Sequence, residues 1–138
     1  MLMHPYLDIP YSPRLEHFLG GFDIYDLEDS LGVELSKYDP ECPYDRGFLI
    51  SRYIVKRFAA LSYRHKFVLF FVLVEALDGD PKVFSDVLEH DPISPSLLPL
   101  GWDEMNDPKA FFEDVYVKLS EAWAEDLYKA SQEDFSTW

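Results

Sequence analysis

The run Phe67–Leu77, FVLFFVLVEAL, constrains the fold of this chain more than any other stretch. Ten of its eleven residues are apolar, and Glu75 is the exception. A helix that is apolar around its whole circumference has to be buried on all sides. A membrane span needs about 20 apolar residues, and this run ends at Asp78, so burial in a protein core is the better interpretation. We therefore expect a buried central helix over about residues 63–77, with the rest of the chain packed around it.

Helical periodicity recurs through most of the chain, whereas the apolar–polar alternation of a strand does not. Val68–Val74 has the composition of a buried strand, but the helix-favouring residues that follow it favour a helix. We predict an all-α fold, a single domain over residues 1–138 built as a bundle of about five or six helices. We expect an extended arm over residues 1–11 before the bundle and a frayed tail over residues 131–138 after it. The expected helices span residues 13–19, 23–31, 46–61, 63–77, 83–88 and 108–130.

Local start and stop signals place the ends of these helices. A side chain that can accept a hydrogen bond at the N-cap, often followed by proline at the first helical position, predicts a helix start. Such starts stand at Ser12-Pro13, Asp45, Ser62, Asp80-Pro81 and Asp107-Pro108. Glycine is the usual helix stop, and we expect Gly20-Gly21 and Gly32 to end the first two helices. The expected core face of the last helix is Phe112, Tyr116, Leu119, Trp123 and Leu127.

Charge is unevenly distributed along the chain, whose formal net charge is −14. Residues 23–45 hold eight acidic residues against Lys37 alone, and residues 46–66 hold six basic residues and no acidic one. The large negative charge disfavours direct contact with nucleic acid or an anionic membrane and favours a basic protein partner. We expect the six basic residues to pair with acidic neighbours inside the fold.

The compartment is indicated by the N-terminus and the cysteine content. Cys42 is the only cysteine, so no intramolecular disulfide can form and a reducing compartment is compatible with the chain. The first ten residues, MLMHPYLDIP, have neither the basic nor the apolar region of a signal peptide. We expect a cytoplasmic, monomeric protein.

No motif for catalysis or cofactor binding is present: no glycine-rich phosphate loop, HExxH, CxxC or GxSxG. Glu75 is a candidate general base, but a pair with a basic residue of a neighbouring helix is the preferred interpretation. His90, between Glu89 and Asp91, could help to hold a metal ion, although solvated charges at a helix end are the preferred interpretation. Cys42 follows an acidic residue, a setting that disfavours a reactive thiolate. We therefore expect no catalytic residue, no cofactor and no metal.

The acidic segment, residues 23–45, also contains three Tyr-Asp pairs. Tyrosine is enriched at binding hot spots because it combines a large apolar area with a hydroxyl group. Carboxylates beside it attract a basic partner and speed the encounter. The alternative is that the tyrosines anchor a loop while the aspartates cap turns. The interface interpretation predicts partner-binding residues at Asp23, Tyr25, Asp26, Glu28, Asp29, Tyr38, Asp39, Glu41, Tyr44 and Asp45.

A small, acidic, helix-rich and cysteine-poor chain with interleaved Tyr and Asp resembles the immunity proteins of bacterial toxin systems. The residues with this character are Phe22–Asp29, FDIYDLED, and Tyr38–Asp45, and no family motif is matched. The resemblance implies a stoichiometric inhibitor that masks a basic surface of a cognate toxin or effector.

Two other binding functions and an enzyme remain as alternatives. A DNA mimic, of the kind that inhibits restriction or CRISPR systems, would space its carboxylates like phosphates without relying on tyrosine. An acidic secretion chaperone would expose an apolar groove and form a dimer. An enzyme would depend on Glu75 or on the residues around His90.

Overall fold

The computed structural model describes residues 1–89, 93 and 96–138, and its regular elements are all helical. Within the described residues the only β-type pairing is an isolated antiparallel bridge between Met3 and Pro10. The predicted all-α class is confirmed. The α-helices are α1 (Val33–Leu35), α2 (Pro43–Ile50), α3 (Tyr63–Asp78), α4 (Lys82–Asp86), α5 (Pro108–Ala122) and α6 (Ala124–Ser131). The 3-10 helices are η1 (Leu15–Phe22), η4 (Trp102–Glu104) and η5 (Phe135–Thr137), and the π-type turns are η2 (Glu28–Gly32) and η3 (Ser51–Val55).

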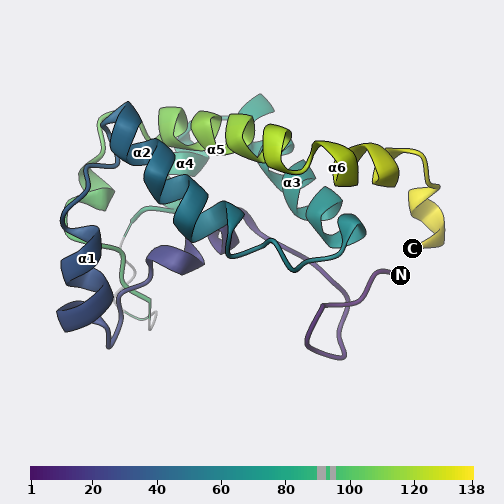
Figure 1. Ribbon diagram of the computed structural model, residues 1–138, viewed down its shortest axis with the longest axis horizontal. Helices are drawn as coiled ribbons and strands as arrows, with labels where there is room; N and C mark the ends of the chain where they lie inside the picture. The colour runs from purple at the N-terminus through teal and green to yellow at the C-terminus, as the bar shows by residue number, and fades with distance from the viewer. Residues whose placement is uncertain (90–92, 94–95) are drawn as a thin grey trace.

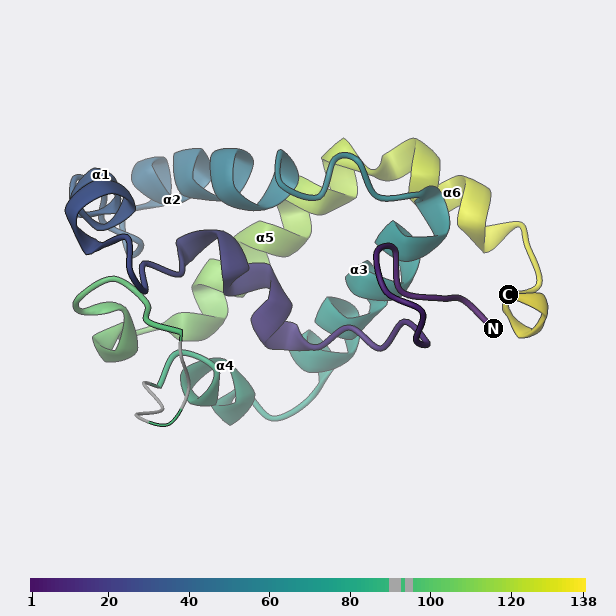
Figure 2. The ribbon, with the colours of Figure 1, turned by 90° about the horizontal axis from the view of Figure 1, so that it is seen from below.

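Helix α5 lies at the centre of the packing. It contacts α2, η3, α3, α4 and α6, and Figure 2 shows it passing between α2 and α3. Its apolar residues Phe111, Phe112, Val115 and Leu119 are each 0% exposed. The element that the other helices cover is therefore α5.

Residues 63–77 form a helix as predicted, but the prediction that this helix is buried on all sides is wrong. Helix α3 does form, but it buries Lys66, Leu69 and Leu73 on one side while Phe71 stays 48% exposed on another. Glu75 is exposed and forms no ion pair with any residue in the described part of the chain. The reason is that α5, α6 and η1 cover only part of the circumference of α3. No helix among the described residues is long and apolar enough to cross a membrane.

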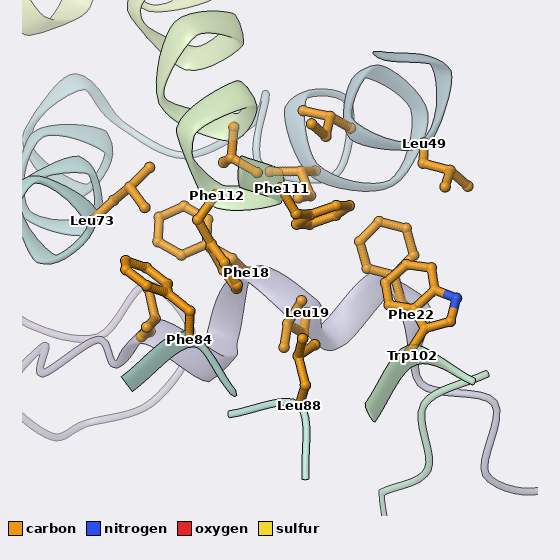
Figure 3. Packing of buried hydrophobic residues seen from close by; sticks show 14 of the residues in the cluster. Phe18, Leu19, Phe22, Leu49, Leu73, Phe84, Leu88, Trp102, Phe111 and Phe112 are labelled. Atoms are coloured by element: carbon orange, nitrogen blue, oxygen red, sulfur yellow. The ribbon is translucent and has the colours of Figure 1, made fainter. Parts of the chain in front are cut away.

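The core lies between η1 and α5 (Figure 3). Side chains of Phe18, Leu19 and Phe22 project from η1 toward Phe111 and Phe112 of α5. The aromatic rings interlock: the Phe22 ring centroid lies 4.6 Å from that of Trp102, and the Phe84 centroid lies 5.0 Å from that of Phe112. Aromatic side chains bury the largest apolar areas, so this layer contributes most of the hydrophobic stabilisation.

Glycine has a packing role in η1. The sequence predicts a stop at Gly20-Gly21, yet η1 runs through both residues to Phe22. A Cβ atom on Gly21 would lie 2.5 Å from the carbonyl oxygen of Tyr53. Only glycine permits so close an approach of two backbones, so this position lets η1 cross the residues of η3.

The predicted helix over residues 23–31 begins later and does not stop at Gly32. Residues 23–27 form a turn instead, in which Asp26 has a φ of +60°, a left-handed conformation that Asp tolerates better than most residues. Helical structure then runs through Gly32 into α1. Helix α2 begins at Pro43, before the predicted Asp45 cap, and its continuation η3 ends at Val55 instead of near Leu61.

The predicted single helix over residues 108–130 is two helices that meet at Trp123, whose φ and ψ are −106° and 13°. Phe112, Leu119 and Trp123 are buried as predicted. Tyr116 is 39% exposed, so its expected place in the core is wrong. The buried stripe runs through Phe111 and Val115 instead, because α5 has neighbours on both of its sides.

Both chain termini lie at the same end of the molecule (Figure 1). The first residues fold back on themselves, where the backbone N–H of Tyr11 donates to the carbonyl of Leu2 over 2.9 Å, instead of forming a simple extended arm. The tail is packed where the sequence predicts fraying: Trp138 is 9% exposed, and the ring centroids of Phe135 and Phe67 lie 4.9 Å apart. Exposed apolar area on α3 gives these two aromatic residues a surface to bury.

The N-cap of α5 supplies a first testable prediction. The Asp107 carboxylate accepts a hydrogen bond from the backbone N–H of Ala110 over 3.2 Å, as the Asp107-Pro108 signal predicts. Replacing Asp107 with Ala is expected to lower the free energy of unfolding by about 1 kcal/mol, because one N–H of the first turn loses its partner. Asp107→Asn is the matched control and should stay close to wild type in urea unfolding. Equal losses in both variants would contradict the capping role.

Candidate functional site

The acidic segment meets a distant part of the chain at one end of the molecule, opposite the termini. In Figures 1 and 2, α1 and the turn before it lie beside the green segment that contains η4. The two segments enclose a groove of about 530 Å³, which we call the acidic groove. Predicted residues in its lining are Glu28, Tyr38, Asp39 and Glu41, and the facing residues are Pro99, Leu100, Gly101, Trp102 and Met105.

One wall of the acidic groove is tied to the opposite segment by Asp23. Its Oδ1 atom accepts hydrogen bonds from the backbone N–H groups of Tyr25, over 3.0 Å, and of Leu97, over 2.9 Å. The backbone N–H of Ile24 also donates to the carbonyl of Leu97 over 2.7 Å. A carboxylate that accepts two backbone hydrogen bonds orders a turn, so Asp23 helps to hold this wall in place.

A second set of carboxylates orders the loop that leads into α2. Asp45 accepts the backbone N–H of Asp39 over 3.0 Å, and Asp39 accepts that of Glu41 over 2.9 Å. Glu41 in turn accepts the backbone N–H of Asn106 over 2.5 Å, across the acidic groove. For these residues the turn-capping interpretation accounts for the side-chain contacts.

Arg46 anchors the same loop to the core. It is 8% exposed, and its guanidinium donates to the carbonyls of Pro40, over 2.9 Å, and Glu41, over 3.3 Å. The third hydrogen bond is to the Asp114 carboxylate of α5 over 3.0 Å. A fork of guanidinium donors can hold several acceptors at once, so Arg46 fixes the position of this wall.

The basic residues of 46–66 are partly paired inside the fold, as the sequence predicts. Besides Arg46, Arg64 pairs with Glu133 and Lys66 with Asp126, each over 2.8 Å. Arg52 and Lys56 are exposed on the surface of the helical segment. The pairing prediction is therefore confirmed for three of the six bases.

Three carboxylates of the acidic segment differ from the rest. Asp26, Glu28 and Asp29 are exposed, and none of them forms an ion pair or a hydrogen bond through its side chain with any residue that the structure describes. Glu34 pairs with Lys37 over 3.1 Å, so its charge is offset. The three unpaired carboxylates are the ones in this segment whose oxygens are free to meet a cationic group of a partner.

The three tyrosines of the Tyr-Asp pairs also differ in exposure. Tyr25 is 50% exposed and Tyr44 is 87% exposed, and both can contact a partner. Tyr38 is half-buried and lines the acidic groove, with its ring centroid stacked 4.7 Å from that of Phe48. The structure therefore places the Tyr38 ring in the lining of the groove and leaves the Tyr25 and Tyr44 rings exposed outside that lining.

The sequence prediction missed the loop that faces the acidic segment. Leu100 is 103% exposed, and Gly101 beside it has a φ of +89°, a conformation suited to glycine. A second hollow, of about 350 Å³, shares Ile24, Leu100 and Gly101 with the acidic groove and adds the carboxylates of Glu89 and Asp103. The Pro99-Leu100-Gly101 sequence signals a turn, but no local pattern indicates what the turn faces. Trp102, which follows this turn, is 2% exposed.

Ionisable groups with clear pKa shifts lie away from the acidic groove. Burial raises the pKa of Tyr11 to about 12, and burial lowers the pKa of His17. The hydrogen bond from the Tyr63 hydroxyl, followed by that from Arg64, lowers the pKa of Glu133. The hydrogen bonds of Tyr63 and Arg64 to Glu133 tie the segment after α6 to the start of α3.

Metal ligands are not assembled in the described part of the chain. There, no group of three or more His, Cys, Asp or Glu side chains is placed to hold a metal ion. His90 and Asp91, the alternative metal site in the sequence analysis, lie outside the described residues. Cys42 is half-buried at the N-cap of α2. What the acidic groove offers is carboxylate oxygens and aromatic surface, which suit guanidinium and ammonium groups.

Comparisons with protein-family models, with curated proteins and with solved structures found no match to this chain.

Proposed function

We propose that this chain is a protein-binding inhibitor that covers a basic surface of a partner protein, as immunity proteins cover a cognate toxin or effector. The observation that supports it is the group of unpaired, exposed carboxylates at Asp26, Glu28 and Asp29 next to the exposed ring of Tyr25, in the acidic segment that also exposes the ring of Tyr44. The protein acts as a cytoplasmic monomer without a cofactor and binds neither nucleic acid nor a membrane.

The walls of the acidic groove are ordered by hydrogen bonds, and this order favours tight binding of a partner. The hydrogen bonds of Asp23, Glu41 and Arg46 hold the backbone on both sides of the acidic groove before a partner arrives. A preorganised surface loses less conformational entropy on binding. The unpaired carboxylates then provide long-range attraction, and the tyrosines provide buried contact area.

Capture of the partner from the native host, followed by surface plasmon resonance, tests the proposal. The double variant Glu28→Gln/Asp29→Asn is expected to slow association about tenfold at low salt, because electrostatic steering governs the on-rate. The effect should shrink at physiological ionic strength, where the Debye length is about 8 Å. Tyr44→Ala should instead speed dissociation about tenfold or more, because the ring contributes burial.

The matched control is Glu121→Gln/Glu125→Gln, which removes two exposed carboxylates from α5 and α6 and so changes the net charge equally. It should bind the partner at the wild-type rate within about twofold. If the control pair slows association and the Glu28/Asp29 pair does not, the interface is on the last helices and the proposed site is wrong. If every acidic substitution contributes a similar small loss and Tyr44→Ala none, a DNA mimic replaces the proposal.

A secretion chaperone is the second candidate, and one observation favours it. Helix α3 leaves apolar side chains on the surface, with Phe71 48% exposed and Val72 half-buried beside it. A chaperone of this kind would also be a dimer. Sedimentation equilibrium of the purified chain distinguishes the two, since the inhibitor is expected to be a monomer at micromolar concentration.

A further inference from the structure

The outer face of α3 is the largest conflict between the sequence and the packing. The sequence makes this helix apolar on all sides, and a helix of that kind is ordinarily covered on all sides. Two hollows follow its uncovered face, of about 500 Å³ and about 710 Å³, and both include Phe71 and Glu75. We call this continuous surface the α3 groove.

The floor of the α3 groove is apolar. The first hollow is lined by Phe67, Val68, Phe71 and Val72 of α3, and the second adds Val74 and Leu77. Across from them, Tyr116 and Val117 of α5 are 39% and 50% exposed. Contiguous exposed apolar surface of this kind marks an interaction site.

The chain itself occupies one end of the α3 groove. Phe135 of the tail stacks on Phe67 with ring centroids 4.9 Å apart, and the Trp138 centroid lies 5.9 Å from that of Phe67. This contact shows that aromatic and apolar side chains from a separate segment fit the face. Beyond it, from Phe71 to Asp78, the side of α3 that carries Phe71, Val74, Glu75 and Asp78 is left uncovered.

The rim of the α3 groove is acidic. Glu75, Asp78 and Glu113 are exposed on it, and none of them forms an ion pair with a residue in the described part of the chain. Lys109 is the only basic residue in the lining of either hollow among the described residues. Two copies of this chain that met through the groove would bring these carboxylates together, which is unfavourable in a protein of net charge −14. A basic occupant is favoured for the same reason.

We propose that the α3 groove is a docking site for a basic amphipathic helix of a partner protein. The apolar side of such a helix covers Phe71, Val74 and Val117, and its lysines or arginines meet the carboxylates on the rim. The uncovered part of α3 is about 12 Å long at 1.5 Å per residue, which matches roughly two turns of a partner helix. The inference does not depend on the acidic groove, which lies at the other end of the molecule.

A designed peptide tests the proposal directly. The probe is a fluorescein-labelled amphipathic helix of about 14 residues with leucines on one side and lysines on the other. Fluorescence anisotropy with the full chain should show saturable binding. Replacing the lysines by glutamates should weaken binding at least about tenfold, and so should a scrambled sequence of the same composition that has no apolar side.

Variants of the protein locate the binding site. Phe71→Asp should weaken binding of the lysine peptide at least about tenfold, and it should fold normally by circular dichroism because Phe71 is 48% exposed. Val117→Asp, on the facing helix, is a second variant with the same expectation. The Asp103→Asn/Glu104→Gln pair, which removes two exposed carboxylates from η4 and lies away from the α3 groove, should leave binding unchanged.

Three results would overturn the proposal. One is equal binding of the scrambled and amphipathic lysine peptides, which would show charge attraction without a groove. Another is undiminished binding by both the Phe71 and Val117 variants. The third is a wild-type dimer that the Phe71 variant dissociates, which would make the face an interface between two copies of this chain.

Discussion

Replacing Phe111 with Ala is expected to lower the free energy of unfolding by about 3–5 kcal/mol. Phe111 is 0% exposed, and its ring centroid lies 5.7 Å from that of Trp102 and 6.1 Å from that of Phe22. Removing the ring leaves a cavity among rigid aromatic side chains that cannot collapse to fill it, so both the burial of the ring and the contacts of its neighbours are lost. Urea unfolding followed by circular dichroism measures the change.

The matched control for this prediction is Phe71→Ala on α3. It removes the same side chain from an α-helix, but Phe71 is 48% exposed, so the loss should stay below about 1 kcal/mol. The comparison decides which helix is central. If Phe71→Ala were the more damaging change, α3 would be the buried element, as its sequence predicts, and the packing described above would be wrong.

Replacing Arg46 with Ala is expected to lower the free energy of unfolding by about 3 kcal/mol. The guanidinium is nearly buried and donates to the carbonyls of Pro40 and Glu41 and to the Asp114 carboxylate. Its loss leaves the two carbonyls without this donor and removes the tie between the groove wall and α5. The Asp114 side chain is 44% exposed, so solvent screens the ion pair and reduces its contribution to the free energy of unfolding.

Two variants separate the anchoring role of Arg46 from its charge. Arg46→Lys keeps the charge but not the planar fork of donors, so it should recover only part of the stability. Arg52→Ala removes an exposed arginine from η3 and should change stability by less than about 0.5 kcal/mol. Faster hydrogen exchange at the amide of Glu41 in Arg46→Ala, with Asn106 following, would show that the wall has loosened. Unchanged exchange at both amides would contradict the anchoring role.

The sequence alone does not distinguish the carboxylates of the acidic segment that order backbone from those that are free to meet a partner. Every Asp and Glu in residues 23–45 contributes equally to its composition, yet Asp23 and Glu41 are used to order backbone while Asp26 and Asp29 are free. The backbone groups that Asp23 and Glu41 accept belong to Leu97 and Asn106, more than 60 residues away along the chain. No local pattern reports on a partner at that distance.

What the sequence determined by itself was the local part of the structure. It specified the all-α class, the caps at Ser62 and Asp107, and the opposite charges of residues 23–45 and 46–66. Each depends on interactions within one helical turn or on charge counted along the chain, so neighbours in sequence are sufficient to predict it. Only the tertiary structure decided that α5 is central, that α3 keeps an apolar face uncovered, and that the 99–105 loop closes the acidic groove. Periodicity measures how apolar the side of a helix is, but coverage depends on how many other elements reach it, and that is set by the packing of the whole chain.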